Sequence, residues 1–356
     1  MTSNINQKKF YYQVYGLTLQ VNQVLPGLIT VPANAPIDLW IELLGRPPSE
    51  MRLGEQARWV ATYENGTSEN NFKMWLACED DGEYVRLRYA GINNSGNTEW
   101  HEFVIDPSGS RVWVTWTAPT QDMVAFLLGP VLAVVLRRRG ITCLHASVVA
   151  VGEQAIAILG PKGAGKSTTA AAFSQLGMTV LADDIAALVD KENSFLVQPG
   201  YPRLRLAPQA ATALIGSSDV LSRVFYQDKN APDKRYLDLT HNGQGFPAHP
   251  YPLSAIYLLG ERDAQIDTPF ISPIPTTTAI INLVKHTSAN FMLDRTQRVD
   301  EFKVLARLAK HVPLRLIHRP NDLNALSQLC EVILNDVPRG KSRGKSRGKS
   351  RGKSRG

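Results

Sequence analysis

Residues 155–169 decide the fold, and they read Ala155-Ile-Ala-Ile-Leu-Gly160-Pro-Lys-Gly-Ala-Gly165-Lys166-Ser167-Thr168-Thr169. The five apolar residues before Gly160 indicate a buried strand, and the Ala-rich residues 168–176 predict a helix that ends at Gly177. Between them stands the complete pattern G-x-x-x-x-G-K-[ST]. Its glycines allow backbone conformations in which successive N–H groups point at oxyanions, so the stretch predicts a phosphate-binding loop.

The loop assigns a phosphate-binding role to consecutive residues. Lys166 would bring positive charge to the β- and γ-phosphates of ATP, and Ser167 would offer an oxygen to Mg²⁺. A chance glycine turn is the alternative, but it would have to coincide with a strand, a helix and an intact Lys-Ser-Thr. The predicted nucleotide-binding residues are Gly160, Pro161, Lys162, Gly163, Ala164, Gly165, Lys166, Ser167 and Thr168.

Two carboxylates end the next apolar segment, which runs from Met178 to Asp184. Open α/β sheets bind ligands beyond the carboxyl ends of their strands, so an acid that serves a metal belongs at this position. Adjacent strand residues point in opposite directions, so we expect one acid to face Mg²⁺ and the other to face an incoming hydroxyl. The alternative is that Asp183 and Asp184 only cap the following segment.

Several cations and one histidine are further candidates. His145 lies in a predicted strand over residues 141–150, where it is either a core residue or a catalytic one. Arg203 and Arg205 alternate along another predicted strand, followed by a predicted helix over 208–215. Lys234 and Arg235 are the main cations of a predicted loop over 224–251. These four cations either clamp phosphate or decorate an exposed face.

The composition excludes several classes of protein. With 356 residues and 44% hydrophobic residues, the chain can form two domains with real cores. Its three cysteines are far apart and show no C-x-x-C pairing, so neither a disulfide framework nor a zinc site is indicated. We expect a cytoplasmic protein with no secretory signal, and with no transmembrane segment, because the most apolar run is short and contains Gly129-Pro130.

The basic charge is concentrated in the last residues. The formal net charge is +7, but the Arg-Gly-Lys-Ser repeats from Arg339 onward contain nine Lys or Arg and no acid, which leaves 30 basic and 32 acidic residues elsewhere. A repeat without apolar residues cannot bury enough surface to offset its ordering entropy, so we expect residues 338–356 to be disordered. The tail either contacts nucleic acid or an anionic surface or is a neutral expansion.

Four regions follow from these patterns. Residues 1–118 predict a smaller β-rich domain, with hairpins over 72–89 and 102–116. Residues 119–140 predict a linking helix, residues 141–337 the domain that carries the phosphate-binding loop, and residues 338–356 the basic tail. The expected fold class is α/β.

Three motifs together resemble a known family. Leu144-His145-Ala146-Ser147, the loop Gly160–Ser167 and Leu181-Ala-Asp183-Asp184 are similar, in this order, to the C-terminal domain of HPr serine kinase/phosphorylase, a P-loop fold related to phosphoenolpyruvate carboxykinase. The resemblance covers roughly residues 125 to 335. It implies that Lys166 and Ser167 bind ATP and Mg²⁺, that Asp183 is the catalytic base, that Asp184 binds the metal, and that His145 helps to place the transferred phosphate.

The chain departs from this family after the acidic pair. The family carries Glu-Ile-Arg-Gly where this chain reads Pro202-Arg-Leu-Arg-Leu206, without an acid. The resemblance therefore does not carry over a second metal ligand, the phosphorylase activity or HPr as the acceptor. Shorter relatives include kinases that act on peptides, and the family often forms homo-oligomers.

The leading hypothesis is an ATP- and Mg²⁺-dependent kinase that phosphorylates a hydroxyl of a protein or peptide, and we expect this hydroxyl to be that of a serine. The competing hypothesis is a nucleotide-binding sensor without kinase activity. Such a sensor would engage a partner through the β-rich region or the basic tail.

Overall fold

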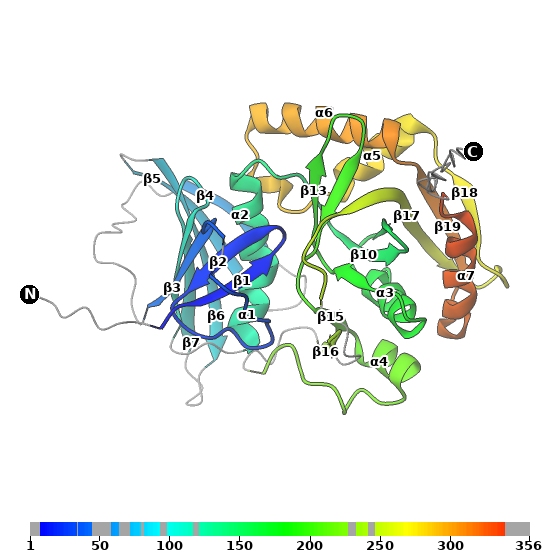
Figure 1. Ribbon diagram of the computed structural model, residues 1–356, viewed down its shortest axis with the longest axis horizontal. Helices are drawn as coiled ribbons and strands as arrows, with labels where there is room; N and C mark the ends of the chain where they lie inside the picture. The colour runs from blue at the N-terminus through cyan, green and yellow to red at the C-terminus, as the bar shows by residue number, and fades with distance from the viewer. Residues whose placement is uncertain are drawn as a thin grey trace, which may run out of the picture.

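The computed structural model describes residues 8–33, 35–44, 58–63, 72–79, 82–92, 98–116, 121–226, 233–240 and 246–338. These residues form a mixed α/β structure with an eight-stranded, a nine-stranded and a two-stranded sheet. The two larger sheets occupy opposite ends of the molecule, with helices between them and around the second (Figure 1). The basic repeats from Arg339 onward lie outside the described residues.

The eight-stranded sheet contains both predicted hairpins. Strand β5 pairs antiparallel with β6, and β7 pairs antiparallel with β8, so these two predictions are confirmed. The strand order is β1-β2-β3-β8-β7-β6-β5-β4. The strands are β1 (Phe10–Val14), β2 (Leu17–Val21), β3 (Leu39–Leu44), β4 (Arg58–Tyr63), β5 (Phe72–Glu79), β6 (Gly82–Ile92), β7 (Thr98–Ile105) and β8 (Arg111–Thr115).

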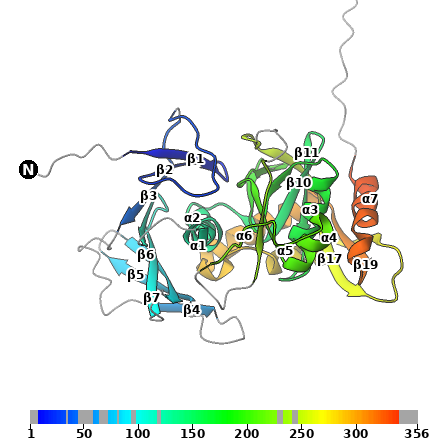
Figure 2. The same ribbon diagram turned by 90° about the horizontal axis from the view of Figure 1, so that it is seen from below.

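A helical segment follows the first sheet, and it is not one regular helix. It consists of α1 (Gln121–Phe126), the π-helical turn Leu127–Val131 and α2 (Leu132–Arg138). Gly129 departs from helical geometry, with φ −95° and ψ −105°, and Pro130 follows it. The eight-stranded sheet curls around this segment, which Figure 2 shows end-on. The expected linking helix is therefore present over the described residues, but with a break at its centre.

The nine-stranded sheet carries the loop 160–165. Strand β11 leads into the loop, and it pairs in parallel with β17, which pairs in parallel with β19. Its strands are β9 (Cys143–Leu144), β10 (Ala146–Val151), β11 (Gln154–Leu159), β12 (Val180–Ala182), β13 (Ala186–Asp190), β14 (Phe195–Gln198), β17 (Tyr251–Asp263), β18 (Phe270–Pro273) and β19 (Leu314–Pro320). Strands β15 (Arg203–Leu206) and β16 (Arg235–Asp238) form the small sheet.

Helices cover both faces of the nine-stranded sheet. Alternate residues of β11 point to opposite faces, so Ile156 and Ile158 pack with α3 and α7, whereas Ala157 joins the core toward the first sheet. The remaining helices are α3 (Lys166–Gln175), α4 (Pro208–Ile215), α5 (Thr276–Lys285), α6 (Arg295–His311) and α7 (Leu326–Asp336), with short 3₁₀ turns at Asn290–Met292 and Leu323–Ala325. Helix α6 begins with a capping box between Asp294 and Gln297.

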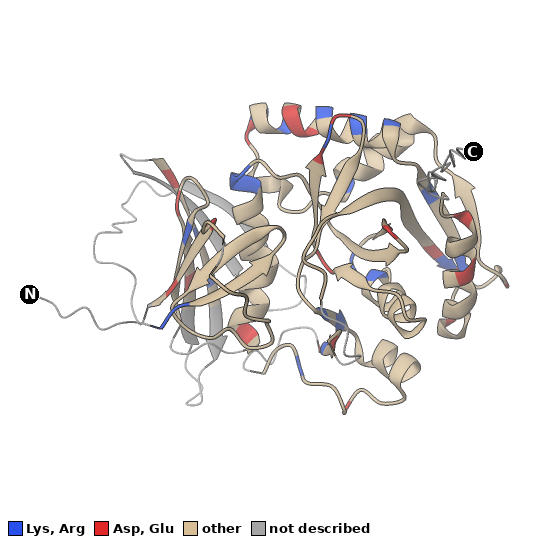
Figure 3. Cartoon of the chain, in the orientation of Figure 1, with Lys and Arg blue, Asp and Glu red and all other residues tan. Residues whose placement is uncertain are grey.

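One continuous apolar core joins the two larger sheets. It contains Leu87 of β6, Leu132 of α2, Ala157 of β11 and Leu305 of α6, all fully buried. Basic and acidic residues are interspersed along the described chain, and both signs occur along α6 (Figure 3). No helix in the described ranges is long and apolar enough to cross a membrane.

Candidate functional site

The loop between β11 and α3 has the backbone geometry that its glycines predict. Gly163 and Gly165 have φ values of +80° and +100°, in the left-handed region that a Cβ disfavours. Gly165 also forms the N-cap of α3, so the helix begins at Lys166. The N–H groups of the first helical turn have no partner within the helix and attract anions. The loop is therefore built as an anion cradle.

Lys166 lies folded under this loop. Its side chain is buried, and its Nζ donates hydrogen bonds to the carbonyl oxygens of Gly160 (2.8 Å) and Pro161 (3.2 Å). Burial lowers the pKa of Lys166, while Asp184 and Asp183 act in the opposite direction. Anionic phosphates in the cradle would favour the charged form of this ammonium group.

Asp183 lies at the start of α3, against two hydroxyl groups. Its Oδ1 accepts hydrogen bonds from Ser147 Oγ (2.6 Å) and Ser167 Oγ (2.9 Å), and its Oδ2 accepts one from the backbone N–H of Arg205 (3.3 Å). The residue is only 2% exposed. Burial and the neighbouring Asp184 raise the pKa of the Asp183 carboxyl. A cation beside Ser167 would favour its ionised form.

Asp184 faces the other way, into a cavity. Its φ of +64° is uncommon for a residue with a side chain, although Asp tolerates it better than most. A carboxylate oxygen of Asp184 lies 3.5 Å from Nη1 of Arg205. Burial alone would raise the pKa of the Asp184 carboxyl, but Arg205, Lys234, His145 and Lys166 outweigh burial and hold it below its usual value. Asp184 therefore presents an ionised carboxylate to the cavity.

The π-helical turn of the linking segment anchors Arg205. In a π-turn the N–H of residue i donates to the carbonyl of residue i−5, and Pro130 has no N–H to give to Ala125. Arg205 supplies the missing donor, because its Nη2 lies 2.8 Å from the carbonyl oxygen of Ala125. Nη2 also lies 3.2 Å from the hydroxyl of Tyr201. Three contacts thus orient one guanidinium group beside Asp184.

Two histidines also line the cavity. The Nδ1 of His145 lies 3.0 Å from the carbonyl oxygen of Asp184, and the N–H of His145 donates to the carbonyl of His286 (2.6 Å). Burial, Lys166, His145 and Lys285 lower the pKa of His286 to about 4. His286 is therefore neutral near pH 7. His145 lies in a break between β9 and β10 and not within one strand, which corrects the prediction of a continuous strand over 141–150.

These groups surround a cavity of about 850 Å³. The loop, the linking segment and the residues after α5 all contribute to its lining, and the residues from the linking segment are apolar. The walls thus come from both halves of the chain. The lining residues are Leu87, Gly129, Pro130, Ala133, Val134, His145, Gly160, Pro161, Lys162, Gly163, Gly165, Lys166, Ser167, Thr168, Asp184, Ile185, Arg205, Ala207, Lys234, Lys285, His286, Thr287, Ser288, Ala289, Asn290 and Phe291.

The structure separates the four cations that the sequence offered as a phosphate clamp. Arg205 and Lys234 line the cavity. Arg203 does not line it, because its guanidinium bonds the side chain of Gln121 (3.0 Å) and lies 4.8 Å over the ring of Tyr236. Arg235 is buried and pairs with Asp233. It lies in β16, which pairs with β15, so the predicted loop over 224–251 contains a strand.

The two acids have surroundings that differ from those which their expected roles require. Asp183, expected as the base, is absent from the cavity lining and contacts Ser167, the expected metal ligand. Asp184, expected at the metal, lines the cavity. The reason is the left-handed backbone at Asp184, which breaks the strand at the point where the two side chains diverge.

Sequence reasoning missed several groups of the site. Ser147 appeared only within the His145 motif, and Lys285 and His286 were not among the predicted site residues. His286 lies directly after α5, more than a hundred residues beyond the loop, and no local pattern connects it to His145. The Gly129-Pro130 dipeptide was noted only as a break in an apolar run. A proline inside a helical segment has no N–H and leaves one backbone carbonyl without its donor, so Pro130 was the signal available in the sequence.

The donor set fits magnesium and a nucleotide. Ser167 and Asp183 provide a hydroxyl and a carboxylate whose oxygens are 2.9 Å apart, and Asp183 forms no ion pair with another described residue. Mg²⁺ is usually held by one or two carboxylates together with the phosphates of a substrate. No cluster of three or more His, Cys, Asp or Glu that could hold a metal occurs in the described parts of the chain. This donor set therefore suits a metal that arrives with phosphate.

No protein-family model and no curated protein matches the chain. Among solved structures, part of the chain is similar to the HPr(Ser) kinase/phosphatase from Coxiella burnetii. The identity is 11% and the TM-score is 0.29, over 54% of this chain and 88% of that chain. A likeness of this size carries no argument about activity.

Proposed function

We propose that this protein is an ATP- and Mg²⁺-dependent phosphotransferase that phosphorylates a hydroxyl group, a serine of a protein or peptide in the first instance. One observation carries the proposal. The carboxylate of Asp183 is joined to the hydroxyl of Ser167, while its neighbour Asp184 faces the cavity beside Arg205. Phosphoryl transfer needs in-line positioning and charge neutralisation, and these groups supply both.

Each residue then has a separate task. Lys166 and the N–H groups of the loop hold the phosphates, and Ser167 and Asp183 hold the metal. Bound Mg²⁺ would neutralise charge on the phosphate oxygens. Asp184 accepts the proton of the acceptor hydroxyl, and Arg205 with Lys234 stabilises negative charge on the transferred group. His145 holds the Asp184 backbone through the 3.0 Å contact with its carbonyl oxygen.

The cavity supports an acceptor that enters between the two halves of the chain. Its volume of about 850 Å³ exceeds what the terminal phosphates require, and its lining includes apolar residues such as Val134 and Phe291. A serine side chain with its flanking residues would fit this shape better than a free sugar, which needs more polar partners. We assign the phosphate-binding domain to residues 141–337 and the smaller β-rich domain to residues 1–118.

A labelled-phosphate experiment tests the function. With γ-labelled ATP, Mg²⁺ and cell extract, the wild-type protein should transfer label to an acceptor. Lys166→Ala should lose ATP binding and transfer together. Asp184→Asn should bind ATP normally and lose transfer by at least about a hundredfold. Asp183→Asn should instead raise the Mg²⁺ concentration that is needed. Wild-type transfer by Asp184→Asn would contradict the role given to this residue.

A nucleotide sensor is the second candidate, and one contact favours it. Tyr15, in the turn between β1 and β2, donates its N–H to the carbonyl of Pro199 (2.7 Å). The ring of Tyr15 is buried edge-on against Tyr201, whose hydroxyl contacts Arg205. This chain of contacts would let the first sheet respond to a bound nucleotide. Tight ATP binding with no labelled acceptor would favour this function.

A further inference from the structure

Two arginines stand side by side at the edge of the nine-stranded sheet, next to the phosphate-binding loop. Arg262 on β17 and Arg319 on β19 are directly opposite each other in the parallel pairing of these strands. Like charges in this arrangement destabilise a sheet. Neither arginine forms an ion pair with a carboxylate of the described residues. An unfavourable pairing without a compensating acid calls for an anionic partner.

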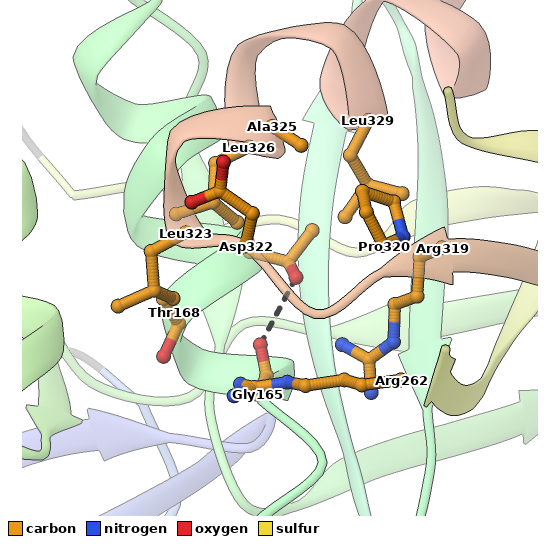
Figure 4. Close-up of a pocket in the computed structure, with 11 residues that line it drawn as sticks. Gly165, Thr168, Arg262, Arg319, Pro320, Asp322, Leu323, Ala325, Leu326 and Leu329 are labelled. Carbon is orange, nitrogen blue, oxygen red and sulfur yellow. Dashed lines mark hydrogen bonds between the residues drawn. The ribbon is translucent and has the colours of Figure 1, made fainter. Parts of the chain in front are cut away.

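The local backbone holds both side chains at the loop. The pairing of β17 with β19 shifts register between Leu259 and Arg262, and the carbonyl oxygen of Gly260 in this irregularity accepts a hydrogen bond from Nε of Arg319 (3.0 Å). Such irregularities often aim a side chain at a site. A Cβ on Gly165 would lie 3.5 Å from Nη2 of Arg262 and 3.6 Å from Nη1 of Arg319. Figure 4 shows both side chains next to Gly165.

The two arginines differ in exposure. Arg262 is exposed, whereas Arg319 is only 7% exposed. Burial and the neighbouring Arg262 lower the pKa of Arg319 to about 10, so it remains charged near neutral pH. A buried, charged guanidinium without a carboxylate needs compensation, and an oxyanion at the start of α3 would give it.

The place of the pair in the sheet indicates which anion it meets. Strands β11, β17 and β19 are parallel neighbours, and ligands bind beyond the carboxyl ends of such strands. The loop follows the end of β11, and the arginines lie near the ends of the other two. They line a small cavity of about 20 Å³ that shares Gly165 and Thr168 with the large cavity, but not Asp184. The pair therefore belongs to a part of the site that the proposed proton acceptor does not line.

We propose that Arg262 and Arg319 form a subsite for the α-phosphate of the nucleotide, at the end of the phosphate chain that is not transferred. This inference rests on the proposed function and gives the nucleotide its direction. The small cavity has room for about one water molecule, so the guanidinium groups meet phosphate oxygens and not a base. The nucleoside then extends toward a polar cavity of about 440 Å³, which shares Pro320, Asp322 and Ala325 with the small one.

Binding measurements with charge-matched variants test the subsite. The dissociation constants of ATP and of inorganic tripolyphosphate are measured by calorimetry for wild type, Arg262→Gln and Arg319→Gln. Arg295→Gln, an exposed position on α6, controls for net charge. A lost charge-assisted hydrogen bond should weaken both ligands about tenfold or more in the two subsite variants, with no change in the control.

Any of the following three outcomes would overturn the proposed subsite. Unchanged affinity for both ligands in both variants would mean that the arginines do not meet the nucleotide. Weaker binding of ATP alone would move their contact to the base or ribose. If added inorganic phosphate alters the wild-type ATP affinity and the variants abolish only this response, the pair binds a separate anion. If circular dichroism shows that Arg319→Gln does not fold, the ATP and tripolyphosphate affinities of the exposed variant Arg262→Gln decide whether the subsite exists.

The same measurements separate this inference from the proposed function. Lys166→Ala reports on the cradle alone. If Lys166→Ala binds ATP as tightly as wild type, the proposed function fails whatever the arginines do. If Lys166→Ala loses ATP while both arginine variants retain wild-type affinity, only the subsite fails.

Discussion

Asp183 and Asp184 show how two identical side chains acquire different chemistry. Asp183 is enclosed by the hydroxyls of Ser147 and Ser167, and its pKa is raised by burial and by its neighbour. Asp184 meets Arg205, and the surrounding cations lower its pKa against the effect of burial. The direction of each carboxylate, and not its residue type, therefore sets its pKa and its neighbours. The left-handed backbone at Asp184 produces this divergence.

His286 predicts a pH dependence of stability. Its folded-state pKa of about 4 lies below the ordinary value of 6.5, so the unfolded chain binds the proton more readily. The free energy of unfolding should therefore fall as the pH decreases from about 6.5 toward 4. Above about pH 7 the contribution of His286 to it should be constant. Because the ring is partly exposed, we expect a loss of only about 1 kcal/mol.

His286→Gln should remove this part of the acid sensitivity. The check is chemical unfolding at several pH values between 4 and 7.5, with His311→Gln, an exposed histidine on α6, as the matched control. Parallel stability curves for wild type and His286→Gln would show that the histidine titrates normally in the folded protein.

At the scale of elements, the π-helical turn connects the linking segment to the chemistry. Pro130 leaves the carbonyl of Ala125 without its π-turn donor, and Arg205, 80 residues further along the chain, takes its place. An irregular helical turn thus has a specific consequence at the site. Such turns often occur at functional sites because they release one backbone group for another use.

Pro130→Ala should loosen Arg205. The new N–H would compete for the carbonyl of Ala125, and the helix would become more regular, so stability should stay equal or rise slightly. We expect the transfer of labelled phosphate to fall about tenfold, with ATP affinity unchanged.

A double-mutant cycle checks this route. If Pro130→Ala acts through Arg205, it should have little further effect on transfer in an Arg205→Gln background. Full additivity of the two losses would show that the turn affects transfer in another way.

At the scale of the whole molecule, the two larger sheets are joined by one core. The cluster that contains Leu132 extends from Phe103 in the first sheet to Leu308 on α6. The wall of the large cavity that is formed by Ala133 and Val134 belongs to the same helical segment. The cavity therefore depends on the packing of both halves, and we expect the halves to unfold together.

Leu132→Ala should destabilise the whole described structure. Leu132 is fully buried in the shared core, so its truncation should cost about 3 kcal/mol. Thermal unfolding should remain a single transition with a lower midpoint, and hydrogen exchange should accelerate in both sheets. Leu176→Ala, at a position 53% exposed, is the control and should shift the midpoint little. Two separate thermal transitions, with only one midpoint lowered by Leu132→Ala, would show that the halves unfold independently.

The basic tail gives a separate prediction at this scale. Deletion of residues 339–356 removes nine positive charges. Binding of the full chain to a DNA duplex should weaken steeply between about 50 and 200 mM salt, and it should disappear in the deletion variant. ATP affinity should not change. Equal DNA binding by both proteins would place the nucleic-acid contact elsewhere, and no binding by either would favour a neutral repeat.

Contiguous patterns accounted for much of the fold. The strand, loop and helix around Gly165, the helix over 208–215 and the hairpin of β7 and β8 follow from periodicity and turn residues within about twenty positions. The strand β16 was missed because Pro, Gly and Asn dominate its surroundings, and its pairing with β15 comes from tertiary contacts.

The sequence by itself determined that this chain carries a glycine-rich loop with a lysine and a serine between a strand and a helix, followed by an acidic pair, because these signals are local and contiguous. Only the tertiary structure decided which acid meets Ser167, that Arg205 but not Arg203 enters the cavity, and that Arg262 faces Arg319. The physical reason is that these outcomes depend on strand register, on backbone twists at single residues and on contacts between segments far apart in the chain. No local pattern encodes such distances.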